Sequence, residues 1–204
     1  AVYPMQLSCL DEGGYNQDPT DPADSRFVKV DIDKFKGQYA LQFTADSQGV
    51  QVPSAKTNKI DISKQFDINI WFTPEATQLQ DGSDEPTLWS FRDSNNGLDI
   101  RITGTNGNNS SWRVYLIVDD GTIPATGYTG SSELIMNTLS NPTRIMPCHI
   151  RVKRGSDNLL KAFVNGVEDI SISKSGSMQP SSTAMVFGDT ESSSSDEYKG
   201  KIHE

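Results

Sequence analysis

Residues 149–173, HIRVKRGSDNLLKAFVNGVEDISIS, contain three short runs in which apolar and polar residues alternate. Alternation with a period of two is typical of β-strands that bury one face. Two turn-forming breaks, GSDN (155–158) and NG (165–166), separate the runs and favour antiparallel hairpins. The stretch therefore predicts a three-stranded meander. One of its faces carries His149, Arg151, Lys153 and Lys161. These charged residues form either a binding site or the solvated side of a sheet.

The same alternation recurs along most of the chain. In QFDINIWFTP (65–74), one face is apolar and the other carries Asp67, Asn69, Trp71 and Thr73. Further strands are expected at 37–43, 49–53, 87–93, 98–104, 112–120, 184–189 and 198–204, with shorter ones at 5–10 and 26–32. The expected inward residues of two central strands are Leu98, Ile100, Ile102, Trp112, Val114, Leu116 and Val118. No convincing helix is found. The pattern predicts an all-β, antiparallel two-sheet sandwich in one domain, 1–204, with an irregular segment at 1–35.

Composition excludes several classes of function. The chain has 204 residues, with 27 acidic against 18 basic side chains and a net charge of −9, so we expect no nucleic-acid partner. No apolar run is long enough to insert into a membrane, and no signal peptide or lipidation motif is seen.

A chain of this length folds without needing a disulfide. Cys9 and Cys148 are either joined by a disulfide or buried as two thiols.

An ordered series of motifs resembles the laminin-G-like branch of the concanavalin A-like lectin and glucanase superfamily. The series is GQYALQF with GVQVP, then FDINIWFTP, LWSFRDSNNGLDIRI with WRVYLIV, the HI-x-V…L-x-x-F-V-N-G hairpin at 149–166, and the closing YKGKIHE. The resemblance covers 37–204 and implies two curved antiparallel sheets stacked as a jelly roll. In relatives the last strand continues past the final Glu. We therefore expect either a truncated strand or a longer polypeptide.

Glycosidases of this superfamily place their carboxylates on one strand, usually as E-x-D-x-E. Because alternate residues of a strand point to the same face of the sheet, these carboxylates lie side by side. A retaining enzyme holds two of them roughly 5–5.5 Å apart. The nearest phrase here is DINIW, which supplies Asp67, Asn69 and Trp71 and so only one carboxylate. The two histidines, His149 and His203, belong to no hydrolase or metalloprotease motif. We therefore expect no enzymatic activity.

The resemblance also raises the question of calcium, because laminin-G-like domains often hold one such ion at a loop rim. Calcium takes six to eight oxygen ligands and tolerates irregular loops. The candidate ligands are Asp93, Asn95, Asp119 and Asp120, in the segments RDSNNGLD and VDDG. None of these segments has the spacing of a defined calcium loop. Two interpretations stay open: a calcium site, or turn chemistry alone with no cofactor.

The polar faces of the predicted strands supply the candidate ligand-binding residues. These are Asp67, Asn69, Trp71, Asp99, Arg101, Arg113, Tyr115 and Arg151, beside His149 and Lys153. If the strands are neighbours, the charges pair across the sheet and form a solvated surface. Alternatively, the aromatic rings and planar hydrogen-bonding groups form a glycan platform. A third possibility is binding at a loop rim through Trp112 or Tyr128.

The function that these observations favour is a non-catalytic binding or adhesion module that recognises glycans within a larger surface or particle-appendage assembly. It would bind a glycan or a protein partner on a surface, as one of several copies in that assembly. Its expected location is extracellular or on a particle surface. Relatives by fold include glycan-binding modules, adhesion domains, glycosidases and phage appendages, so fold alone does not fix function. The alternative is a structural decoration or fibre subunit, for example of a phage particle, with no small ligand. A glycoside hydrolase is third.

Overall fold

The computed structural model describes residues 27–29, 39–43, 49–52, 54–57, 60–75, 85–105, 108–121, 125–134, 147–174, 176–181, 183–189 and 197–203. These residues form thirteen strands and one four-residue helix. The elements are β1 (Phe27–Lys29), β2 (Tyr39–Phe43), β3 (Val50–Val52), α1 (Ser54–Thr57), β4 (Phe66–Pro74), β5 (Thr87–Arg92), β6 (Asn96–Thr105), β7 (Asn108–Asp120), β8 (Thr126–Glu133), β9 (Cys148–Arg154), β10 (Leu159–Val164), β11 (Val167–Ser173), β12 (Met185–Phe187) and β13 (Gly200–His203).

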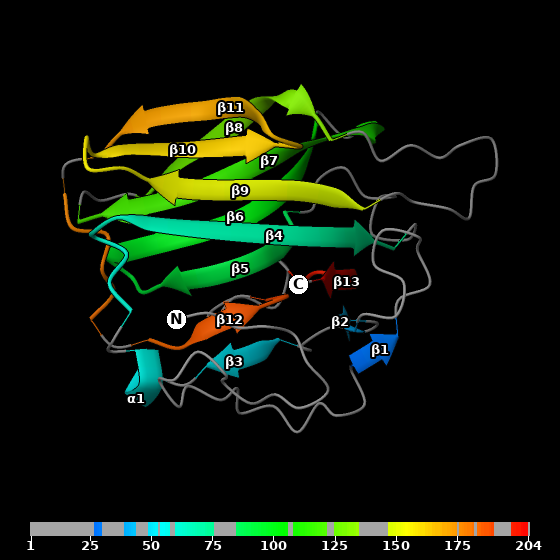
Figure 1. Ribbon diagram of the computed structural model, residues 1–204, viewed down its shortest axis with the longest axis horizontal. Coiled ribbons are helices and arrows are strands. Elements are labelled where there is room, and N and C mark those ends of the chain that lie inside the picture. The colour runs from blue at the N-terminus through cyan, green and yellow to red at the C-terminus, as the bar shows by residue number, and fades with distance from the viewer. Residues whose placement is uncertain are drawn as a thin grey trace.

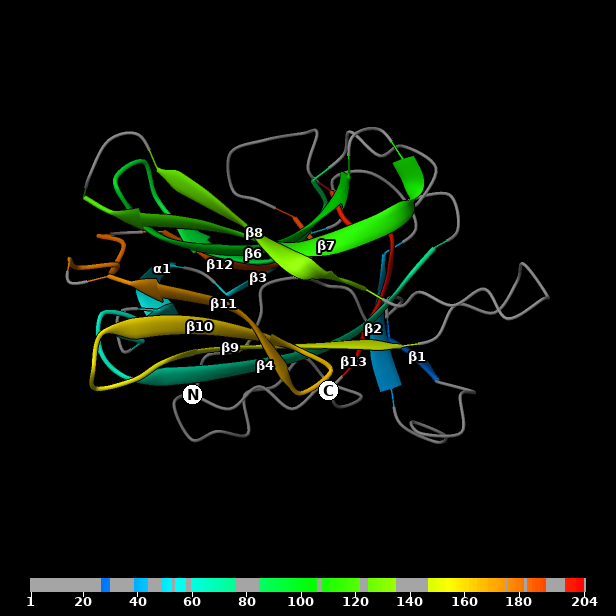
Figure 2. The same cartoon turned by 90° about the horizontal axis from the view of Figure 1, so that it is seen from above.

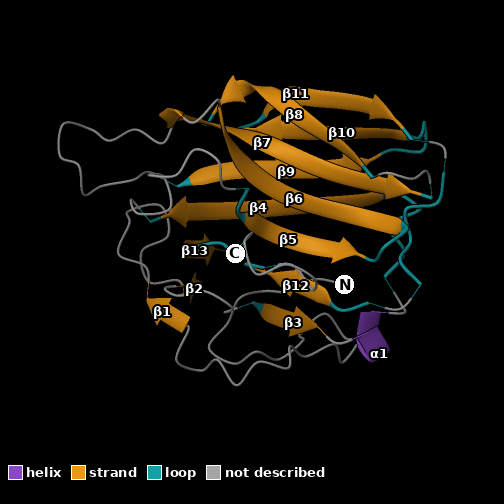
Figure 3. Cartoon of the chain, turned by 180° about the vertical axis from the view of Figure 1, so that it is seen from behind, coloured by secondary structure: helices purple, strands orange, loops and turns teal. Residues whose placement is uncertain are grey.

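The strands form two antiparallel sheets stacked face to face, so the predicted all-β sandwich is confirmed. One sheet has seven strands in the order β1-β2-β13-β4-β9-β10-β11, and the other has six in the order β3-β12-β5-β6-β7-β8. The outer face of the seven-stranded sheet is turned toward the viewer in Figure 1, and Figure 3 shows the six-stranded sheet from behind. Figure 2 shows the two layers edge on.

The predicted meander is confirmed as β9, β10 and β11, which pair in sequence within the seven-stranded sheet. Its second turn has positive φ at both central residues, 48° at Asn165 and 88° at Gly166. This is the backbone that a two-residue Asn-Gly hairpin requires. On its other side β9 pairs with β4, with Trp71 opposite His149 and Asp67 opposite Lys153. The register therefore places the polar residues of two sequence-distant strands on one face.

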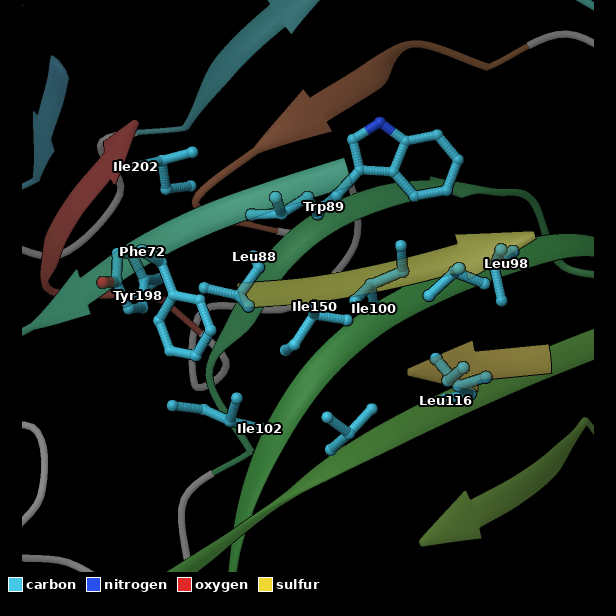
Figure 4. Close-up of a cluster of buried hydrophobic side chains, with 14 of the residues drawn as sticks. Phe72, Leu88, Trp89, Leu98, Ile100, Ile102, Leu116, Ile150, Tyr198 and Ile202 are labelled. Atoms are coloured by element: carbon cyan, nitrogen blue, oxygen red, sulfur yellow. The ribbon is translucent and has the colours of Figure 1, made fainter. Parts of the chain in front are cut away.

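The core lies between the sheets and is built from the residues that alternation predicts (Figure 4). The seven inward residues expected in β6 and β7 are all buried: Leu98, Ile100, Ile102, Trp112, Val114, Leu116 and Val118. Across from them the seven-stranded sheet contributes Ile70, Phe72 and Ile150. Tyr198 lies edge-on to the ring of Phe72, with centroids 6.2 Å apart. The polar residues that alternate with these core positions point to the other side of each sheet.

Several elements differ from the sequence-based expectation. Strand β8 was not predicted, β7 begins four residues earlier than expected, and α1 is an unexpected single turn. The strand expected at 5–10, and Cys9 with it, lie outside the described residues. Cys148 is buried in β9, where burial raises the pKa of its thiol to about 11. No helix in the described ranges is long and apolar enough to cross a membrane.

Strand β8 closes one side of the sandwich against β11. Asp169, on β11, accepts hydrogen bonds through Oδ1 from the backbone amides of Ser131 (3.0 Å) and Ser132 (2.7 Å) on β8. The contact joins the edge strands of the two sheets. A carboxylate that accepts two backbone N–H groups makes a charge-assisted link. This link connects the two sheets along the side where β8 and β11 meet.

Candidate binding faces of the two sheets

The eight candidate ligand-binding residues do not share one face, and the expectation of a single platform containing Asp67, Asp99 and Arg101 is wrong. Asp67, Asn69, Trp71 and Arg151 lie on β4 and β9 of the seven-stranded sheet, whereas Asp99, Arg101, Arg113 and Tyr115 lie on β6 and β7 of the six-stranded sheet. The chain changes sheets between β4 and β5. Because the apolar sides of both sheets point inward, the two polar sets face opposite directions.

The first surface, which we call the β4–β9 face, consists of Asp67, Asn69, Trp71, His149, Arg151 and Lys153. These residues are directly opposite in pairs, as Trp71 with His149, Asn69 with Arg151, and Asp67 with Lys153. Alternation in both strands turns all six side chains away from the core. The side chains of Asp67 and Arg151 are 43% and 42% exposed. The face is therefore open to solvent across its centre.

Two contacts organise the β4–β9 face. The rings of Trp71 and His149 are stacked, with centroids 4.4 Å apart and planes 26° from parallel. Beside them, Arg151 donates hydrogen bonds to Asp67, from Nε to Oδ1 at 2.9 Å and from Nη2 to Oδ2. This planar two-point contact fixes both side chains. The hydrogen bond from Arg151 lowers the pKa of Asp67, against the opposing effect of partial burial.

His203 continues the row of polar residues toward β13, but it is buried. It lies opposite Trp71 in the register, and its Nε2 is 2.9 Å from Thr73 Oγ1. Burial, together with the positive charge of Lys201, lowers the pKa of His203 to about 4, from about 6.5 in an unfolded chain. The native imidazole is thus neutral at pH 7. His203 therefore lies next to Trp71, on the side of β4 opposite to His149.

The buried His203 makes the fold sensitive to acid. Below pH 6.5 this histidine is protonated in the unfolded chain, whereas in the native chain it stays neutral down to about pH 4. The free energy of unfolding therefore decreases as the pH is lowered from 6.5 to 4, and then levels off. We expect this residue to remove about 2 kcal/mol of unfolding free energy between pH 7.5 and pH 5, or about 4–8 °C in Tm. Thermal melts of the wild type and His203→Gln test this. The variant should lose that part of the pH slope, whereas His149→Gln should keep it.

The second surface is a polar cluster on the outer side of β5 and β6, centred on Asp99. The Asp99 carboxylate is fully buried and accepts hydrogen bonds from Ser90 Oγ (2.7 Å), Arg92 Nε (3.0 Å) and Arg101 Nη2 (2.9 Å). Arg101 Nη1 lies 3.7 Å from Glu85. Both oxygens of Asp99 are therefore occupied by protein donors. The cluster ties neighbouring strands together and leaves this carboxylate no open acceptor for a ligand.

The remaining two predicted residues flank this cluster on β7. Tyr115 lies opposite Arg101, and Arg113 lies opposite Thr103. The Tyr115 hydroxyl rests over the backbone of Gly127, where an added Cβ would fall 2.1 Å from it. Burial raises the pKa of Tyr115, and the charge of Glu85 acts in the same direction. Both side chains are half-buried, and their role in binding stays a prediction.

Neither surface has the arrangement of a retaining glycosidase. Asp67 is held ionised by Arg151 and so is poorly suited to donate a proton. Asp99 has no exposure to solvent. On β4 the positions that alternate with Asp67 hold Asn69 and Trp71, which supply neither a general acid nor a nucleophile. The geometry of these two faces favours binding over hydrolysis.

The four candidate calcium ligands come together at one end of the six-stranded sheet, but their oxygens do not converge. Asp93 Oδ1 accepts from the amides of Asn95 and Asn96, each at 2.8 Å, and Oδ2 accepts from the Ser181 amide at 2.8 Å. These bonds are the turn chemistry that the sequence also allowed. The Asp93 carboxylate thus fastens the β5–β6 turn to the loop at 181.

Asp119 and Asp120 point to opposite sides of β7, as consecutive residues of a strand must. Asp119 is buried, and its Oδ1 accepts from the Gly121 amide at 3.2 Å. Asp120 Oδ2 lies 3.5 Å from Lys174 Nζ. Within the described ranges, no group of three or more His, Cys, Asp or Glu side chains could hold a metal ion. Calcium binding at this rim stays a prediction.

The sequence did not identify every residue of the two surfaces. Ser90 and Arg92 belong to the Asp99 cluster but were not predicted, although they alternate on β5. Trp112 is 2% exposed, so its own side chain offers a ligand almost no surface, and binding at a rim through Tyr128 stays a prediction. Tyr128 is half-buried beneath Lys174 Nζ, which lies 5.3 Å from its ring centroid.

Comparison with known proteins identifies the fold. No family model matches the sequence, and no curated protein matches it either. Among solved structures, domain 4 of AbnA, a GH43 extracellular arabinanase from Geobacillus stearothermophilus in complex with arabinotriose, matches with a TM-score of 0.52 and 17% identity, over 87% of this chain and 71% of that one. The IT-sialidase CBM40 of Ruminococcus gnavus matches with a TM-score of 0.54 and 13% identity, over 80% and 86%.

Another matching structure is the ligand-binding domain of botulinum neurotoxin serotype D, in complex with N-acetylneuraminic acid. Its TM-score is 0.61 at 13% identity, and the match covers 95% of this chain. The chain spans only 43% of that toxin domain. At these identities the likeness concerns the fold alone. The chain therefore has the concanavalin A-like jelly-roll fold that its motifs indicated.

Proposed function

We propose that the protein is a non-catalytic glycan-binding module that binds its ligand on the β4–β9 face. The observation that carries the proposal is the stack of the half-buried Trp71 and His149 rings beside the exposed Arg151–Asp67 pair. An aromatic ring offers a surface to the C–H groups of a sugar ring, and guanidinium, carboxylate and amide groups offer planar hydrogen-bonding partners to its hydroxyls. Because the Arg151–Asp67 pair is preformed, little conformational freedom is lost on binding.

The matched structures support a binding role. They include a domain in complex with arabinotriose and another in complex with N-acetylneuraminic acid. A half-exposed sheet face suits shallow recognition with weak affinity per site. Useful avidity then comes from several copies held together. We therefore place the module in a multivalent surface or particle-appendage assembly, outside the cell or on a particle surface.

The proposal is tested on a glycan array with the wild type and variants of the β4–β9 face. Trp71→Ala and Arg151→Ala are expected to weaken binding to the best glycan by at least about tenfold, because each removes a central contact. Arg113→Ala tests the other face, since it removes a predicted binding residue from the six-stranded sheet. It should bind as the wild type does. Folding of each variant is checked by its thermal melt.

Two results would count against the proposal. If Trp71→Ala and Arg151→Ala bind as strongly as the wild type, the ligand lies elsewhere. If the wild type binds no glycan on the array, the structural alternative becomes the better account. That alternative predicts self-association or docking onto a scaffold, which analytical ultracentrifugation detects.

A further inference from the structure

The outer face of the seven-stranded sheet is basic, although the chain as a whole is acidic, with a net charge of −9. Cross-strand register places four cations among the described residues of this face, at Arg151, Lys153, Lys161 and Lys201. Its carboxylates, among the same described residues, are Asp67 and Glu168. Four positive charges against two negative ones leave a surplus of two. The surplus lies on and beside the face proposed to bind glycans.

The two carboxylates are already engaged. Asp67 is held by Arg151, and Glu168 Oε2 lies 2.8 Å from Lys161 Nζ. Lys153 lies directly opposite Asp67 in the register, yet Asp67 pairs diagonally with Arg151 instead. Lys153 has no carboxylate within ion-pair distance among the described residues. Its Nζ stands 5.0 Å from the centroid of the Phe163 ring, an arrangement that holds an ammonium group in place.

Lys153 also lies directly opposite Lys161 on the neighbouring strand. Lys161 is already paired with Glu168, so Lys153 is the ammonium group that remains for an added anion. We propose, building on the proposed glycan-binding function, that the ligand is an anionic glycan and that Lys153 receives its negative group. The group is a carboxylate or a sulfate, since an ammonium group binds either as a point charge. Trp71 and Arg151 then contact the sugar ring beside it.

The test compares neutral, carboxylate-bearing and sulfate-bearing glycans printed on one array, with wild type, Lys153→Gln and Lys64→Gln. The strongest wild-type signals are expected on acidic glycans and should weaken as salt is raised, because charge attraction is screened. Lys153→Gln should lower the affinity for those glycans about tenfold, as loss of one charge-assisted contact would. Lys64→Gln removes the same charge from a side chain that is 81% exposed and lies outside the candidate binding residues, and it should change little. The carboxylate and sulfate arms identify which group is bound.

The outcomes separate this inference from the proposed function. Hits that are predominantly neutral, or acidic hits that Lys153→Gln binds as tightly as the wild type, overturn the inference and leave the glycan-binding function standing. An array with no hits overturns the proposed function, and the inference with it. Equal losses in Lys153→Gln and Lys64→Gln would indicate attraction by net charge alone. That result also contradicts a specific role for Lys153.

Discussion

Replacing Asp99 with alanine is expected to lower the free energy of unfolding by about 3–5 kcal/mol, because breaking a buried ion pair leaves its partner charge uncompensated. Asp99 is fully buried and bonded to two arginines, of which Arg101 has a side chain only 5% exposed. Removing the carboxylate leaves N–H donors of these guanidinium groups without a hydrogen-bond acceptor, in a site with little water. Urea denaturation of the variant measures the loss.

The exposed pair on the β4–β9 face supplies the matched control for Asp99. Asp67→Ala also removes an arginine-bound carboxylate, but that carboxylate is 43% exposed and water can replace it. Its unfolding midpoint should stay close to that of the wild type. If Asp99→Ala shifts the midpoint no more than Asp67→Ala does, the cluster on the six-stranded sheet is solvated. The division between a structural cluster and an open binding face would then fail.

The second large effect is expected at Gly97, where β6 begins opposite the last residue of β5. Its φ is +136°, and a Cβ added there would fall 2.3 Å from the carbonyl oxygen of Phe91 and 2.4 Å from Arg92 Cα. These are backbone atoms of the partner strand and cannot move aside alone. Gly97→Ala should therefore cost about 2–5 kcal/mol through backbone strain and overpacking.

Gly121→Ala is the control for Gly97, because it separates steric conflict from an unfavourable φ. Gly121 lies at the same rim with φ +84°, but the nearest atom to its added Cβ is Asn96 Oδ1 at 3.6 Å. Only the left-handed backbone is then penalised, at about 1–2 kcal/mol. Thermal melts of both variants provide the comparison. Equal losses would mean that the β5–β6 pairing tolerates a side chain at Gly97.

Local pattern predicted most strands of this fold because most of them have one buried and one solvated face. The exception, β8, is an edge strand with the sequence TGYTGSSE, in which only Gly130 is buried. Its inward positions are Tyr128, Gly130 and Ser132, so only one large apolar side chain lies on that face and the sequence shows no apolar alternation. The short strands β12 and β13 were also expected, but not their partners. β13 pairs between β2 and β4, far away in the sequence.

The candidate site was predictable only in part for the same reason. Alternation correctly placed Asp67 and Trp71 on one side of β4, and Arg151 on one side of β9. It could not show that Asp99 belongs to the other sheet, because the pattern of β6 looks the same in either sheet. Nor could it show that Asp67 pairs diagonally with Arg151 and leaves Lys153 available. Such contacts depend on register and on the choice of sheet, which are set by the whole core.

The central claim, that a glycan binds on the β4–β9 face, is tested most directly by the indole N–H signals in a two-dimensional NMR titration with the best glycan from the array. The chain has three tryptophans. Trp89 and Trp112 are buried, at 3% and 2% exposure, and so act as internal controls for Trp71. The Trp71 signal is expected to shift with added glycan, together with the amides of His149 and Arg151, while the other two indole signals stay in place. An unmoved Trp71 signal, with shifts instead at Arg101 and Tyr115, would contradict the claim.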